Sequence, residues 1–112
     1  MNSTNTSYSF PILKLKSPKD ILFENIPFRT PLVQVIVDSP WFQRCRFINQ
    51  LQCTPLVYPS AQHTRFAHQL QTYHCTNLWL DHLLEQQPEL KQECIPRIKE
   101  LIGLGALLHD IG

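Results

Sequence analysis

The sequence has no long apolar run, no Cys-x-x-Cys pair and no large excess of charge, and each absence excludes a class of protein. No apolar stretch has the length of a membrane span, and the N-terminus lacks the basic-then-apolar order of a signal peptide. The net charge of +1 indicates no bulk electrostatic partner such as duplex DNA. The four cysteines lie at unrelated spacings, which favours reduced thiols in a cytoplasmic protein over a zinc site or disulfides.

Glycine is also scarce, and the three glycines all lie in the last ten residues, GLGALLHDIG. Gly103 and Gly105 lack the third glycine and the preceding strand of a dinucleotide-binding loop, but they would let another helix approach closely. Apolar residues on almost every side of this segment predict a buried helix. It ends in His109 and Asp110, a pair that is costly to bury unless it binds a partner or a metal ion. The segment therefore predicts a cation site.

The first part of the chain has little helical pattern. The opening nine residues, MNSTNTSYS, are polar, and prolines recur at positions 11, 18, 27 and 31. We expect a disordered leader over residues 1–18 and no more than a short edge strand before residue 28.

Two proline-led start signals open the helical part of the chain. Thr30-Pro31 and Ser39-Pro40 each place a capping hydroxyl before a proline at the first helical position. They predict one helix through Val37 and a second from Trp41 to Leu51, where apolar residues recur every three to four positions.

Thr64 caps the longest predicted helix, which follows an irregular loop over residues 52–63. The helix is expected from Arg65 to Leu84, with a core stripe of Phe66, Leu70, Tyr73, Leu80 and Leu84, and with Arg65 and His68 together on another face. A short helix from Pro88 to Glu93 and a final helix from Ile95-Pro96 to the His109-Asp110 pair follow. The predicted fold class is all-α.

The segment over residues 37–70 carries a run of linked motifs. It reads VDSPWFQRCRFINQLQCTPLVYPSAQHTRFAHQL, with an aromatic-Gln-Arg run, Ile-x-Gln-Leu and His-x-Arg-Phe-x-His in that order, and ALLHDIG follows near the end of the chain. Together these motifs resemble the start of an HD-domain phosphohydrolase, above all the deoxynucleoside triphosphate triphosphohydrolases. The resemblance implies that residues 19–112 form the N-terminal part of an HD-domain helical core, incomplete at its C-terminus.

The resemblance assigns three metal ligands, His68, His109 and Asp110. The family's fourth ligand is an aspartate that would lie beyond residue 112, so we expect the 112-residue chain alone to be inactive. Two imidazoles with carboxylates suit a first-row divalent ion with open positions, and Fe, Mn, Mg, Ni and Zn all remain candidates.

The resemblance also assigns nucleotide contacts. Arg65 matches an arginine that contacts substrate phosphate, and Gln50 and Leu51 match residues beside the deoxyribose. A further set matches positions that bind a guanine activator in some members of the family: Asp38, Gln43 and Arg46.

The implied activity is hydrolysis of a dNTP to deoxynucleoside and triphosphate by a complete protein that forms a homo-oligomer. Two alternatives stay open. One is an HD phosphohydrolase that acts on another nucleotide, such as a cyclic or alarmone nucleotide. The other is a non-catalytic nucleotide-binding or regulatory module.

Overall fold

The computed structural model describes residues 15–20, 22–93 and 96–111. Its elements in chain order are β1 (Lys19–Asp20), β2 (Glu24–Asn25), α2 (Pro31–Asp38), α3 (Pro40–Gln43), the 3₁₀ turns η1 (Arg44–Phe47) and η2 (Thr54–Leu56), α4 (Arg65–Gln86), α5 (Pro88–Glu93) and α6 (Pro96–Leu108). The only strands in these ranges are β1 and β2, which are two residues long each and pair antiparallel. The all-α prediction is therefore confirmed. No described helix combines the length and the apolar character needed to cross a bilayer.

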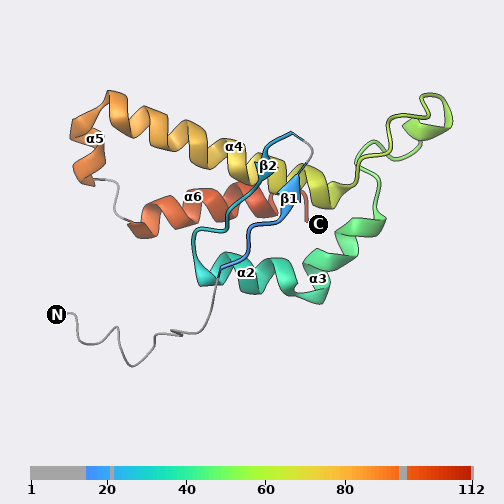
Figure 1. Cartoon of the computed structure of the whole chain (residues 1–112), viewed down its shortest axis with the longest axis horizontal. Coiled ribbons are helices and arrows are strands. Elements are labelled where there is room, and N and C mark those ends of the chain that lie inside the picture. Colours follow the sequence, from blue (N-terminus) through green and yellow to red (C-terminus); the bar gives the residue numbers. More distant parts are fainter. Residues whose placement is uncertain (1–14, 21, 94–95, 112) are drawn as a thin grey trace.

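The two long helices, α4 and α6, lie side by side and run in opposite directions, joined at one end by α5 (Figure 1). This arrangement brings the first turn of α4 to the end of α6. Gly103 and Leu107 of α6 are buried. The start of α4 and the end of α6 therefore meet although they are far apart in the sequence.

The hydrophobic core lies where α4 and α6 meet the segment before α2, α2 itself, α3 and η1. Its members are buried apolar side chains from each of these elements: Ile26, Phe28, Val33, Val37, Phe42, Cys45, Phe66, Leu70, Tyr73 and Leu107. The core stripe predicted for α4 is confirmed, since all five of its residues are at most 8% exposed.

The three predicted helix starts are confirmed at the level of the capping hydrogen bond. The side chains of Thr30, Ser39 and Thr64 each accept a hydrogen bond from the backbone amide three residues later. Such a bond satisfies one of the amides that a helix N-terminus leaves without a partner. These local signals fix where α2, α3 and α4 begin.

The second helix is shorter than its apolar pattern predicted. After α3 and η1 the backbone becomes extended at Ile48 (φ −116°, ψ 120°). Residues 48–50 pair with residues 63–65, and the amide of Arg65 donates to the carbonyl of Ile48 at 2.7 Å. The prediction of a helix to Leu51 is wrong because this pairing requires extended chain.

The final helix is buried on one face only. Leu101 is 59% exposed and Ile102 is 39% exposed, whereas Leu107 is fully buried. The prediction of a helix buried all round is therefore wrong within the described residues, where α4 covers a single face.

Most of the expected leader, residues 1–14, lies outside the described residues. At its end, the amide of Lys16 donates to Gln34 Oε1 at 2.7 Å, and the carbonyl of Lys16 accepts from the amide of Phe28 at 3.0 Å. The chain is thus hydrogen-bonded to the helical part of the molecule before residue 19.

The two glycines of α6 provide a matched test of its contact with α4. A Cβ added at Gly103 would lie 3.1 Å from Tyr73 Cε1 and 3.3 Å from Asn77 Oδ1, whereas one added at Gly105 would meet nothing within 4 Å. Gly105→Ala should raise the free energy of unfolding by about 0.5–1 kcal/mol through helix propensity. Gly103→Ala should give no gain or a loss, because Tyr73 is 2% exposed and its hydroxyl accepts a hydrogen bond from the amide of Arg29. Equal gains in thermal unfolding experiments would contradict the close packing.

Candidate metal centre

Three titratable side chains at one end of the α4–α6 pair converge on one point. His68 lies in the first turn of α4, and His109 and Asp110 follow the last residue of α6. The Nε2 atoms of His68 and His109 are 3.2 Å apart. Oδ2 of Asp110 lies 3.3 Å from the first of these atoms and 3.2 Å from the second.

The spacing of these three atoms suits a shared metal ion. Two ligand atoms each about 2.1 Å from an ion lie roughly 3.0 Å apart at a right angle and roughly 3.4 Å apart at the tetrahedral angle. The observed separations of 3.2–3.3 Å fall between these values. The three side chains are 32–39% exposed, so the expected burial of the pair is wrong within the described residues. The three side chains can occupy three coordination positions of one metal ion and leave its remaining coordination positions open.

The ring of His109 is held in the tautomer that a metal ligand needs. Its Nδ1 lies 2.7 Å from the backbone carbonyl of Ala106. Because a carbonyl only accepts, Nδ1 carries a proton, so the nitrogen that can offer a lone pair to a metal ion is Nε2. A backbone carbonyl in this position is a common second partner of metal-binding histidines. A lone pair 3.2 Å from a carboxylate oxygen is unfavourable without a cation or a proton between them.

The carboxyl of Asp110 is held ionised by its surroundings. The hydrogen bond from Gln50 Nε2, 3.0 Å long, is the largest cause that lowers the pKa of Asp110, and the charge of Arg65 acts in the same direction. An ionised carboxylate is the form that binds a cation. Gln50 thus contacts the cluster directly through Asp110.

The guanidinium of Arg65 is positively charged and forms no ion pair with a described carboxylate. Its side chain is half-buried, and its Nε has no hydrogen-bond partner among the described residues. The charge of Arg65 lowers the pKa of Asp110, which agrees with the predicted shared face with His68. Leu51, assigned to the sugar contact with Gln50, is 45% exposed.

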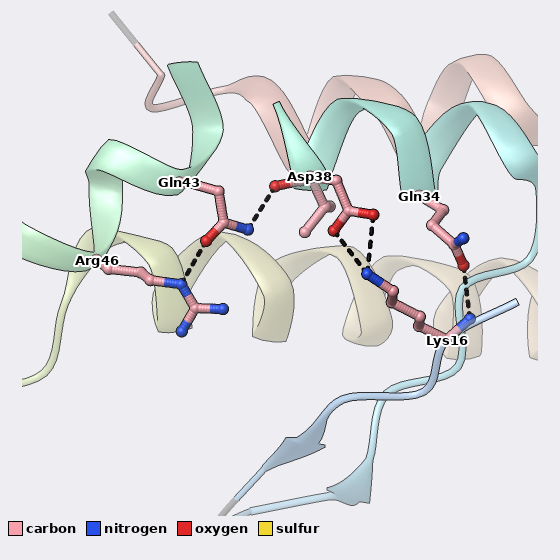
Figure 2. A network of polar contacts seen from close by, with 6 residues as sticks. Lys16, Gln34, Asp38, Gln43 and Arg46 are labelled. Carbon is pink, nitrogen blue, oxygen red and sulfur yellow. Dashed lines mark hydrogen bonds and ion pairs between the residues drawn. The ribbon is translucent and has the colours of Figure 1, made fainter. Parts of the chain in front are cut away.

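The three residues assigned to an activator nucleotide also come together, at a separate place. Asp38, Gln43 and Arg46 line a hollow of about 490 Å³ at the end of α2. Figure 2 shows their polar contacts, which join Gln43 to Arg46 and Asp38 to a lysine. Gln43 Nε2 donates to the carbonyl of Val37 at 2.8 Å, and Arg46 Nε donates to Gln43 Oε1 at 2.6 Å.

Lys16 belongs to the same hollow and was missed by the sequence interpretation. Its ammonium group pairs with Asp38 at 2.9 Å, across 22 positions of the chain (Figure 2). It lies within the stretch expected to be a leader, and no local pattern distinguishes it from the lysines at positions 14 and 19. Only the fold brings this lysine to the hollow.

Comparison with known proteins gives the family. The chain is 39% identical to the deoxynucleoside triphosphate triphosphohydrolase SAMHD1 of Gallus gallus over 82 residues, which cover 73% of this chain. It is 36% identical to SAMHD1 of Bos taurus over 98 residues, 88% of this chain, and 38% identical to SAMHD1 of Homo sapiens over 82 residues, 73% of this chain. No family model matches the sequence.

These relatives confirm the resemblance drawn from the motifs, and the chain belongs to the HD-domain phosphohydrolase family. Within that family its relatives are dNTP triphosphohydrolases. The matched part of this chain spans only 13–16% of the length of these relatives.

A shared ion makes a sharp prediction for the two histidines. In the complete protein, His68→Ala and His109→Ala should each release most of the bound divalent metal, because each removes one of three converging ligands. The double variant should lose little more activity than either single variant, as residues that act as one unit do. Metal content per chain, measured by elemental analysis, checks both statements.

His82→Ala provides the matched control, since this histidine is also on α4 but is exposed and outside the cluster. It should keep the wild-type metal content. Full metal occupancy in His109→Ala would end the metal-site interpretation.

Proposed function

We propose that the complete protein is a metal-dependent phosphohydrolase that converts a dNTP to deoxynucleoside and triphosphate. The observation that carries the proposal is the convergence of His68 Nε2, His109 Nε2 and Asp110 Oδ2 within 3.3 Å of one another. The fixed tautomer of His109 and the ionised Asp110 support it. The named activity of the relatives supports the choice of a dNTP as substrate.

Each residue of the candidate site has a role in this proposal. His68, His109 and Asp110 would hold a divalent ion, which supplies a Lewis acid for a phosphate oxygen and lowers the pKa of a water molecule. Gln50 fixes the orientation of the Asp110 carboxylate through its hydrogen bond at 3.0 Å. We assign the deoxyribose to the side of Gln50 and Leu51.

Arg65 is the proposed phosphate ligand. Its guanidinium carries a charge without a described ion-pair partner and lies close enough to the cluster to affect Asp110. A planar guanidinium can bind two phosphate oxygens at once, with stronger hydrogen bonds than a neutral donor would make. The substrate triphosphate would thus lie between Arg65 and the metal ligands.

If Arg65 binds substrate, its removal should change the kinetics of hydrolysis and leave the stability of the fold unchanged. Arg65→Ala in the complete protein should lower kcat/KM for dNTP hydrolysis by about 10- to 100-fold, the range that loss of a charged hydrogen bond gives. Its melting temperature should stay close to the wild-type value, because the variant breaks no described ion pair.

Arg97→Ala, which removes an exposed arginine of α6, is the control for charge and should change neither quantity. Normal kinetics with a large loss of stability would make Arg65 a structural residue. Hydrolysis of cyclic or alarmone nucleotides, but not of dNTPs, would contradict the proposed substrate and support one of the other nucleotides instead.

We further propose that the hollow beside α2 binds an activating guanine nucleotide. Asp38 offers carboxylate oxygens for the donor edge of a guanine, and Gln43 offers an amide. Lys16, which is paired with Asp38, and Arg46 leave the lining of the hollow with one net positive charge, which favours a ligand that carries phosphate. The polar contacts in Figure 2 support a preformed site.

Asp38→Asn tests this second site. GTP should activate the wild-type protein, and the variant should need about tenfold or more GTP for half-maximal activity, since a hydrogen bond to a charged group is lost. The melting temperature should hardly change, because the Lys16 pair is well exposed.

Asp81→Asn breaks an ion pair of comparable exposure with Arg29 and serves as the matched control, with a normal GTP response. A wild-type protein that is indifferent to GTP, or an Asp38→Asn variant with a normal response, would show that Asp38 and Lys16 only join two segments of the fold.

A further inference from the structure

A surface arginine outside every assigned set reaches the turn that carries Asp110. Arg44 is the first residue of η1, and its Nη2 donates a hydrogen bond of 3.2 Å to the backbone carbonyl of Ile111. The two residues are 67 positions apart in the sequence. Ile111 directly follows Asp110, so the arginine holds the chain one residue beyond the proposed metal ligand.

The turn over residues 108–111 depends on such external contacts. Its one internal backbone hydrogen bond in the described structure runs from the amide of Ile111 to the carbonyl of Leu108, at 3.2 Å. Helix C-termini leave their last carbonyls without partners in the helix. The packing of Leu108 and Ile111 against the core and hydrogen bonds from other segments therefore contribute to the position of Asp110.

Two of those contacts are hydrogen bonds that come from one stretch of chain, in addition to the contact of His68 with Asp110 and the packing of Ile111 against the core. Arg44 donates a hydrogen bond to the carbonyl of Ile111, and Gln50 donates one of 3.0 Å to the carboxylate of Asp110. The first contact is to backbone, so it fixes the path of the chain. The second is to the side chain and fixes the rotation of the carboxylate. Together they define the position of Asp110 from both sides.

The turn η1, which carries Arg44, is anchored in the hydrophobic core. The next residue, Cys45, is fully buried in the core, and Phe42 packs edge-to-face on Phe66 with ring centroids 5.4 Å apart. Phe66 lies on α4, two residues before His68. η1 is thus anchored to the same helix that provides the first proposed metal ligand.

We propose that Arg44 is a positioning residue for the metal site, which holds the Asp110 turn at the distance from His68 that a shared ion requires. This role rests on the proposed function. The described contact of the Arg44 guanidinium is with backbone, and not with the carboxylate of Asp110. Arg44 acts through the backbone of Ile111, as residues that orient metal ligands commonly do.

Binding of Mn²⁺ to the metal-free complete protein tests the proposal. Arg44→Met keeps the aliphatic stem and removes the donor, and should raise the Kd for Mn²⁺, measured by isothermal titration calorimetry, by about tenfold. Arg44→Lys, which keeps a charged donor on a shorter reach, should fall between Arg44→Met and wild type. Arg97→Met on α6 makes the same change of charge at an exposed position and should bind Mn²⁺ normally.

Thermal unfolding separates positioning from a general loss of stability. The metal-free Arg44→Met protein should melt close to the metal-free wild type, whereas the rise in melting temperature on adding Mn²⁺ should be smaller. A wild-type Kd in Arg44→Met, or an equal loss in Arg97→Met, would overturn the role of Arg44 alone. A lower metal-free melting temperature with an unchanged Mn²⁺ effect would make Arg44 merely structural. A wild-type protein that binds no Mn²⁺ would overturn the proposed function and this role with it.

Discussion

The close contact between Gly103 of α6 and Tyr73 of α4 sets the spacing on which the candidate site depends. Tyr73 lies five residues after His68, or about 7.5 Å along α4, and Gly103 lies six residues before His109, or about 9 Å along α6. Because the helices run in opposite directions, both distances lead to the same end of the pair (Figure 1). A side chain at position 103 would press on Tyr73 and Asn77 of α4, about one and a half helical turns from the ligand atoms that lie 3.2 Å apart.

The helix pair alone does not complete the cluster. Asp110 lies past the end of α6, in a turn whose position is set by Arg44 and Gln50 from the segment before α4. That segment is itself attached to α4 by the pairing of residues 48–50 with residues 63–65. The pairing that shortens the second predicted helix therefore also positions Gln50, whose side-chain amide donates to the Asp110 carboxylate.

Features that depend on near neighbours in the sequence could be predicted, and features that depend on distant contacts could not. The capping hydroxyls and the α4 stripe come from patterns within a few residues, and the structure confirms them. The apolar positions from Trp41 to Leu51 gave the right period but the wrong length, because hydrogen bonds to the start of α4 replace helical ones. Lys16 has no local pattern at all, and only its pairing with Asp38 reveals it.

The two candidate sites share structural parts, which gives the activator proposal a physical basis. The guanidinium of Arg46 stacks on the ring of Phe66 with its central carbon 3.9 Å from the ring centroid, and Phe66 is two residues from His68. On the other side of η1, Arg44 holds the turn that carries Asp110. A ligand in the hollow that draws Arg46 away from Phe66 would thus act on η1, which contacts α4 and, through Arg44, the chain just after α6. Such a ligand shifts the metal site only if it binds more tightly when Arg46 is displaced, so the contact between Arg46 and Phe66 is where the two sites would be coupled.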